Sequence, residues 1–116
     1  MSVTWYAQCG IPERCFANCS KLNTFDFAYV QNIGKYAFTS SGLKEIYLAD
    51  NVKEIEEGAF RSCHNLKKVE WNADCSIHDY VFEKCQKLKE VIISDKVCSI
   101  ETDAFKDCPN IEITFV

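Results

Sequence analysis

Eight cysteines and two histidines are the side chains of this 116-residue chain best suited to nucleophilic or metal chemistry. A catalytic cysteine needs a histidine beside it and a third group that orients the histidine. A structural zinc site needs paired ligands, commonly spaced as Cys-x-x-Cys. The sequence contains no such pair, and His64 and His78 each follow an apolar position into a polar connection. We therefore expect solvated histidines, no metal site and no catalytic cysteine–histidine pair.

Acidic pairs, glycine-rich loops and charge runs are the other features that could carry a reaction or a cofactor. Glu56 and Glu57 are adjacent, but such pairs are usually solvated charge, and the four glycines are too scattered for a phosphate-binding loop. The net charge of −4 disfavours nucleic acid and anionic membrane surfaces. No apolar stretch reaches the ~18 residues of a membrane-spanning helix, and no signal peptide is visible at the N-terminus. The sequence predicts a protein without enzymatic activity, cofactor or membrane insertion.

A repeat of 22 or 23 residues organises the chain, and we call equivalent positions in successive repeats a column. The phenylalanine column contains Phe16, Phe38, Phe60, Phe82 and Phe105. Five residues earlier comes an isoleucine column, with Ile11, Ile33, Ile55, Ile77 and Ile100. Residues 1–10 match the end of a repeat. We therefore expect one repeat domain over residues 1–116, itself complete or a fragment of a longer array. It has a partial repeat at 1–10 and repeats that begin near residues 11, 33, 55, 77 and 100.

Each repeat combines two kinds of apolar spacing. Leu66-x-x-Val69-x-Trp71 alternates with period two, which is typical of a half-buried strand. The segment Ile-x-x-x-Ala-Phe-x-x-Cys has near-helical spacing and predicts one or two short helical turns. One repeat cannot bury its own apolar face, so the copies must stack as rungs whose strands form a parallel sheet. The predicted fold class is an α/β repeat solenoid of about five repeats.

The pattern resembles that of the BspA-like, treponemal-type family of leucine-rich repeat proteins. The resemblance rests on Leu66-x-x-Val69-x-Trp71, on Leu88-x-x-Val91-x-Ile93 and on the Gly58-Ala59-Phe60-Arg61-Ser62-Cys63 step. It implies a curved solenoid with the sheet on its concave face and short helical turns on the other. It also implies a non-catalytic recognition role, often at the surfaces of bacteria and parasitic protists, and hence a cell-surface or secreted location.

The repeat gives most cysteines a packing role. Seven occupy columns that are apolar in other repeats: Cys9, Cys15, Cys19, Cys63, Cys75, Cys85 and Cys108. Stacked rungs would place equivalent cysteines about 4.8 Å apart with parallel side chains, whereas a disulfide needs Cβ atoms about 3.8 Å apart that face each other. We expect a buried ladder of free thiols. Cys98 falls in a solvent-facing column, where it is either an exposed reactive thiol or a partly shielded inert one.

Strand residues between the buried positions must point to the exposed face of the sheet. This face is the candidate protein-binding surface, and its candidate residues are Thr24, Asp26, Glu45, Tyr47, Lys68, Glu70, Glu90 and Ile92. In the last repeat, alternation directs Ile111, Ile113 and Phe115 inward. Tyr47 and Ile92 among acidic residues predict an anchor for a basic partner. The alternative is a solvated face whose charges limit aggregation.

Two functions are compatible with this pattern, and we favour non-catalytic binding of a protein ligand on the concave face, in adhesion or host interaction as the resemblance implies. The alternative is a structural module that forms homo-oligomers through uncapped ends. The first end offers Val3, Trp5 and Cys9, and the last offers Ile113, Phe115 and Val116. Flanking residues that fold over these ends would remove that alternative. A thiol enzyme or redox sensor that uses Cys98 is a third hypothesis.

Overall fold

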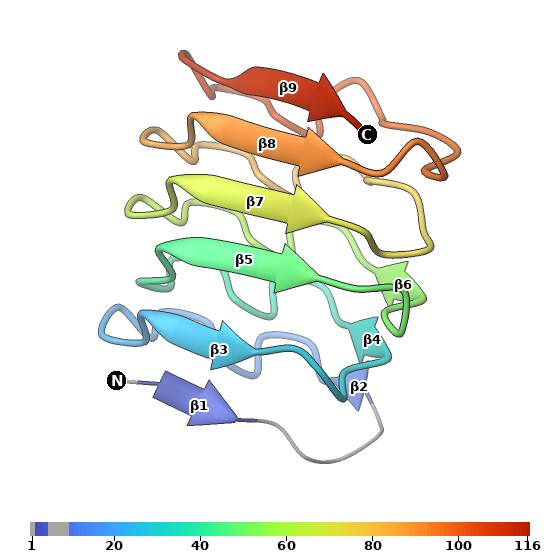
Figure 1. Cartoon of the computed structure of the whole chain (residues 1–116). Coiled ribbons are helices and arrows are strands. Elements are labelled where there is room, and N and C mark those ends of the chain that lie inside the picture. The colour runs from blue at the N-terminus through green and yellow to red at the C-terminus, as the bar shows by residue number, and fades with distance from the viewer. Residues whose placement is uncertain (1, 5–9) are drawn as a thin grey trace.

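The strands of successive repeats lie side by side and parallel in one layer, called the larger sheet below, which consists of a two-stranded and a four-stranded part (Figure 1). The structure is a computed structural model that describes residues 2–4 and 10–116. The strands on this face are β1 (Ser2–Thr4), β3 (Thr24–Asp26), β5 (Glu45–Leu48), β7 (Lys68–Trp71), β8 (Glu90–Ile93) and β9 (Glu112–Phe115). β1 pairs with β3, and β5, β7, β8 and β9 pair in that order. The chain is therefore a parallel-strand solenoid of about five turns, as the repeat predicts.

The register keeps each column together across the rungs. Ile46 pairs with Val69, Val69 with Val91, and Val91 with Ile113. The last of these pairs confirms the register that alternation predicts for the final repeat. Because side chains alternate along a strand, this register puts one set of residues in the core and the other on the open face.

A second, narrower sheet runs along the isoleucine column, which sequence analysis treated only as core. Its strands are β2 (Gly10–Ile11), β4 (Asn32–Ile33) and β6 (Glu54–Ile55), which pair in parallel, and a bridge joins Ile77 to Ile100. The isoleucines at positions 11, 33, 55 and 77 are buried, while neighbours such as Asn32, Glu54 and Glu56 are exposed. This sheet matters for function because it brings polar residues 22 or 23 positions apart into contact.

The prediction of short helical turns was wrong, since no helix occurs in residues 2–4 and 10–116. The segment around each phenylalanine is a chain of β-turns instead. In the first four of these segments, the residues two positions before and after the phenylalanine have left-handed φ angles, for example +66° at Gly58 and +58° at Ser62, and in the last only Asp107 has one. Such residues interrupt a right-handed helix twice within five positions.

Hydrogen bonds explain why the stack of turns is stable. Phe38 N donates to the carbonyl of Ala59 at 2.8 Å, and Ser40 N donates to that of Arg61 at 2.9 Å, both on the next rung. Thr39 N, between them, closes a turn to the carbonyl of Tyr36 at 3.2 Å. Alternate amides thus bond within and between rungs. A helix would direct them all along its own axis, whereas this arrangement lets neighbouring repeats bond to each other.

Stacked phenylalanines fill the core between the sheet and the turns. Each neighbouring pair in the phenylalanine column has its ring centroids 5.2 to 5.6 Å apart and its planes within 14° of parallel. Phe38, Phe60 and Phe82 are fully buried, while Phe16 and Phe105, at the two ends, are partly buried. Trp71 packs edge-on against Phe82 at 5.8 Å. Among the described residues, no helix is long and apolar enough to cross a membrane.

The cysteines are less uniformly buried than the repeat predicts. Cys63 and Cys85 are buried, Cys19, Cys75 and Cys108 are half-buried, and Cys9 lies outside the described residues. Cys15 is exposed, so its assignment to the core was wrong, although Ala37 in the same column is fully buried. Cys15 belongs to the first complete repeat, where described residues cover it from one side. Cys98 is also exposed.

The buried thiols are held by the turns. The thiols of Cys63, Cys85 and Cys108 donate to the carbonyls of Phe38, Phe60 and Phe82, at 3.3, 3.3 and 3.0 Å. Ser41 takes the same position one rung earlier, where its hydroxyl lies 3.4 Å from Cys63 Sγ. The column therefore selects a small side chain that can donate a hydrogen bond to the preceding rung.

We expect timed alkylation of the native protein to label Cys98 first, Cys15 more slowly, and Cys63 and Cys85 last. Burial and the neighbouring Cys19 thiol raise the pKa of Cys15, and burial raises that of Cys85 well above its ordinary value. The thiolate is the reactive form, so both effects slow the reaction. Peptide mass spectrometry gives the order, with urea-denatured protein as the control. Two or more disulfides would contradict the packing of free thiols.

Candidate functional site

The open face of the larger sheet carries the eight candidate residues. The register aligns Glu45, Lys68 and Glu90 in one column and Tyr47, Glu70 and Ile92 in the other. Thr24 and Asp26 are the first and last residues of β3, which precedes β5 along the stack (Figure 1). Lys68, Glu70 and Ile92 are half-buried, and the other five are exposed. The sequence thus predicts which side chains share this face.

Tyr47 is the most exposed aromatic side chain on the face, at 49%. Its hydroxyl donates to Glu45 Oε2 at 2.6 Å, and Lys68 Nζ lies 5.8 Å from its ring centroid. The hydrogen bond to Glu45, together with partial desolvation and the charges of Glu70 and Glu90, raises the pKa of Tyr47 to about 12. Tyr47 is therefore a neutral hydrogen-bond donor with an accessible ring at ordinary pH.

One acid beside Tyr47 is paired with a cation within the face, and another is hydrogen-bonded. Glu70 Oε1 lies 3.6 Å from Lys68 Nζ, while Glu45 accepts the neutral Tyr47 hydroxyl. The ion pair reduces the negative charge available to a basic partner, and the hydrogen bond occupies one oxygen of Glu45. They weaken the sequence-based interpretation of Tyr47 as an anchor for one.

A lysine column beside the candidate residues was missed in the sequence, although a lysine follows the repeat leucine in three successive repeats. Lys44, Lys67 and Lys89 stand there, and all three are exposed. Lys67 N donates to the Lys44 carbonyl at 2.8 Å, and Lys89 N donates to the Lys67 carbonyl at 3.1 Å. Three ammonium groups thus extend from adjacent rungs at the start of the strands.

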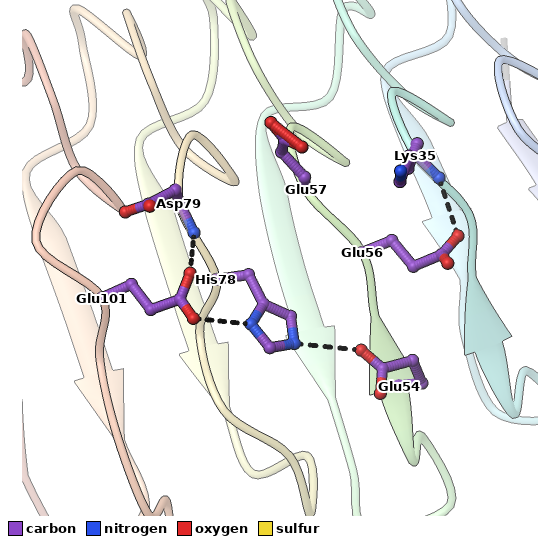
Figure 2. A pocket seen from close by; sticks show the side chains of 7 residues that line it. All are labelled: Lys35, Glu54, Glu56, Glu57, His78, Asp79 and Glu101. Carbon is purple, nitrogen blue, oxygen red and sulfur yellow. Dashed lines mark hydrogen bonds and ion pairs between the residues drawn. The ribbon is translucent and has the colours of Figure 1, made fainter.

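A second polar cluster lies on the narrow sheet, where the ring of His78 connects three rungs (Figure 2). His78 Nε2 lies 3.1 Å from Glu54 Oε1, and Nδ1 lies 3.2 Å from Glu101 Oε2. The other Glu101 oxygen accepts the backbone N–H of Asp79 at 2.8 Å. The expectation of a merely solvated histidine was wrong. The sequence did contain a signal, because Glu56 and Glu101 each directly follow an isoleucine of the column. Each accepts a backbone N–H from the preceding rung, and Glu56 accepts that of Lys35 at 3.1 Å.

This histidine bridge is an ion-pair network between repeats. The bonded carboxylate of Glu101, with help from Glu54, raises the pKa of His78 against a smaller opposing effect of burial. The Asp79 amide, followed by His78, lowers the pKa of Glu101. The three residues of the bridge line a surface pocket, whose other lining residues are Lys35, Glu56, Glu57 and Asp79. Among the described residues, no group of three or more histidines, cysteines and acids is arranged to hold a metal ion.

We expect His78→Gln to destabilise the protein at mildly acid pH and to have little effect at alkaline pH. A raised histidine pKa adds stability below the unfolded value of about 6.5, which is lost as the pH rises through the folded value. The lowered Glu101 pKa adds stability above about pH 4.3, which is lost as the pH falls through its folded value. Thermal unfolding should show the largest difference between these limits. His64→Gln, at an exposed position, is the control; an equal loss at every pH would contradict the bridge.

The strands are parallel with a 22- or 23-residue period, a leucine column and a phenylalanine column pack in the core, and one sheet face is open. Together these features define a leucine-rich repeat solenoid. The chain belongs to the BspA-type leucine-rich repeat family, whose model matches residues 9–115 in six copies. The resemblance stated from the sequence is therefore confirmed.

Two solved structures are similar to this chain. A leucine-rich repeat protein of T. pallidum is 31% identical, with a TM-score of 0.66, over 77% of this chain and 43% of that one. A leucine-rich repeat protein of Bacteroides ovatus shares the fold, with 24% identity and a TM-score of 0.67, over 95% of this chain and 35% of that one. The chain thus spans less than half the length of either protein. No curated protein sequence matches it.

Proposed function

We propose that the protein is a non-catalytic recognition module that binds another protein on the open face of the larger sheet. Tyr47 carries the proposal, because an aromatic side chain that is 49% exposed on a rigid sheet is suited to act as a binding anchor. Tyr47 borders a hollow of about 360 Å³, whose other lining residues are Asn23, Thr24, Phe25, Lys44, Glu45 and Lys67. Family membership supports the proposal, since leucine-rich repeats are generally protein-interaction modules. Recognition at a cell surface, in adhesion or host interaction, is the setting that the resemblance implies.

We expect Tyr47→Ala to lose about tenfold or more in affinity for a captured partner. The partner is identified by capture on the immobilised chain, and its affinity is then measured with purified components. Tyr29→Ala is the matched control, because it removes an exposed tyrosine outside the candidate columns. If the control weakens binding as much, the open face is not the binding surface.

Self-assembly through the solenoid ends is the second candidate, and one observation favours it. Ile113, Phe115 and Val116 are 38%, 61% and 62% exposed at the last strand, although the register directs Ile113 and Phe115 toward the core side. An unpaired strand edge beside apolar side chains can add a strand from another copy. At the first end, the side chains of Val3, Trp5 and Cys9 lie outside those the structure describes.

We expect this alternative to give concentration-dependent dimers that Phe115→Lys weakens and Tyr29→Lys leaves intact. Sedimentation between micromolar and millimolar concentration measures the species directly. A monomer throughout that range would exclude assembly through the last strand and would leave hetero-recognition on the sheet face as the function.

A further inference from the structure

We propose that the open face takes an acidic segment of a partner protein that carries an apolar side chain. This inference rests on the proposed function and names the chemistry of its ligand. The acidic groups of the segment would lie along the lysine column of Lys44, Lys67 and Lys89. Its apolar side chain would enter the hollow beside Tyr47.

The lysine column is a concentrated positive charge that the fold itself does not neutralise. Backbone hydrogen bonds hold its three residues on adjacent rungs, which are about 4.8 Å apart in a parallel sheet. Among the described residues, Lys44, Lys67 and Lys89 make no ion pair, whereas Lys68 is paired with Glu70. Three ammonium groups at this spacing repel one another, and a bound anion relieves that repulsion.

Two adjoining hollows lie beside the lysine column and could hold parts of a ligand. A cleft of about 580 Å³ is lined by Glu45, Lys67, Lys68, Gln86, Lys87, Lys89, Glu90 and Asn110. Four of these are lysines, and the two amides can also donate hydrogen bonds. The hollow beside Tyr47 shares Glu45 and Lys67 with this cleft, and its lining includes Phe25. Acidic groups and an apolar side chain a few residues apart would occupy both hollows at once.

The surroundings favour a short acidic segment over a long polyanion. Glu45, Glu90 and Glu112 stand in the column beside the lysines, and the first two also line the cleft. The whole chain carries a net charge of −4. A long polyanion would run past all three acids and meet repulsion. A basic segment is disfavoured as well, because it would lie against the unpaired lysines, while Glu70 is already paired with Lys68.

The test is a nuclear magnetic resonance titration of the isotope-labelled chain at low salt. The probe is a blocked pentapeptide of one phenylalanine, one serine and three glutamates, which is compared with the same peptide carrying three lysines. We expect the acidic probe to shift the amides of Lys44, Lys67 and Tyr47, and its affinity to fall as salt screens the charges. Lys67→Glu should weaken binding by about tenfold or more, because it reverses the charge that both hollows share. Lys96→Glu, an exposed lysine after β8, changes the net charge equally and should leave binding intact.

Three outcomes would overturn the inference. These are tighter binding of the basic probe, no shift at millimolar peptide, and equal weakening by the two charge reversals. A sulfated oligosaccharide that shifts the same amides, when the acidic peptide does not, would identify a different anion as the ligand. None of these results bears on the proposed function, which fails if a captured partner binds Tyr47→Ala as tightly as the unchanged chain, or if Tyr29→Ala weakens binding as much.

Discussion

Replacing Phe60 with alanine should lower the free energy of unfolding by about 3–5 kcal/mol, the usual cost of removing a buried ring from a packed core. Phe60 is fully buried between Phe38 and Phe82, with centroid distances of 5.3 and 5.6 Å, and meets Phe27 edge-on at 6.0 Å. A cavity at this place removes contacts on both sides of the rung. In a solenoid, a defect at the centre also separates the rungs that stabilise each other.

Phe105→Ala is the matched control, because Phe105 is partly buried and its ring stacks on one phenylalanine, Phe82, at 5.3 Å. It should cost clearly less than Phe60→Ala in urea unfolding followed by circular dichroism. Phe60→Leu should cost about 1.5 kcal/mol or less if neighbouring side chains repack around it. Equal and small losses for both alanine variants would mean that the phenylalanine column is not the core.

The sequence predicted the solenoid because its repeat states the same packing requirement five times. A strand with Val69 and Trp71 inward can pair with its neighbour in only one register without exposing that apolar pair. Glu70, between them, then has to face outward. The candidate face followed from the same argument, which is why its columns align as expected.

The sequence did not predict the turns, since near-helical spacing also fits a chain of two β-turns. What distinguishes them is backbone conformation, and left-handed φ angles occur at residues as ordinary as Tyr36, Tyr80 and Lys84. The bonds from each turn to the next rung stabilise these angles. A single repeat read in isolation contains no sign of those bonds.

Contacts between side chains on different rungs were also missed in the sequence. His78 lies 24 residues from Glu54 and 23 from Glu101, so its role appears only when the rungs are stacked. The lysine column was visible as a column, but its significance depends on which neighbouring acids already have partners. Cys15 was misplaced for a related reason, because a column average ignores that the described residues cover Cys15 from one side.

The second large effect concerns a buried ion pair on the turns, in the column directly after the phenylalanines. Glu83 is 6% exposed, and its Oε1 lies 2.6 Å from Arg61 Nε, on the preceding rung. The buried Nε makes no aligned hydrogen bond, so the attraction is ionic. The guanidinium group therefore compensates a carboxylate that the stacked turns withdraw from water.

Arg61→Met should lower the free energy of unfolding by about 2–4 kcal/mol, slightly below the value for a fully buried pair, since the Arg61 side chain is 39% exposed. The loss arises chiefly from the carboxylate left buried without a partner. The double variant Arg61→Met/Glu83→Leu should therefore recover most of it, because it removes the charge as well as its partner. The exposed pair Lys53 and Asp74 is the control, and Lys53→Met should change stability by less than about 1 kcal/mol. If urea unfolding finds the double variant as unstable as Arg61→Met, the loss comes from packing of the arginine stem. The charge of Glu83 would then have no part in it.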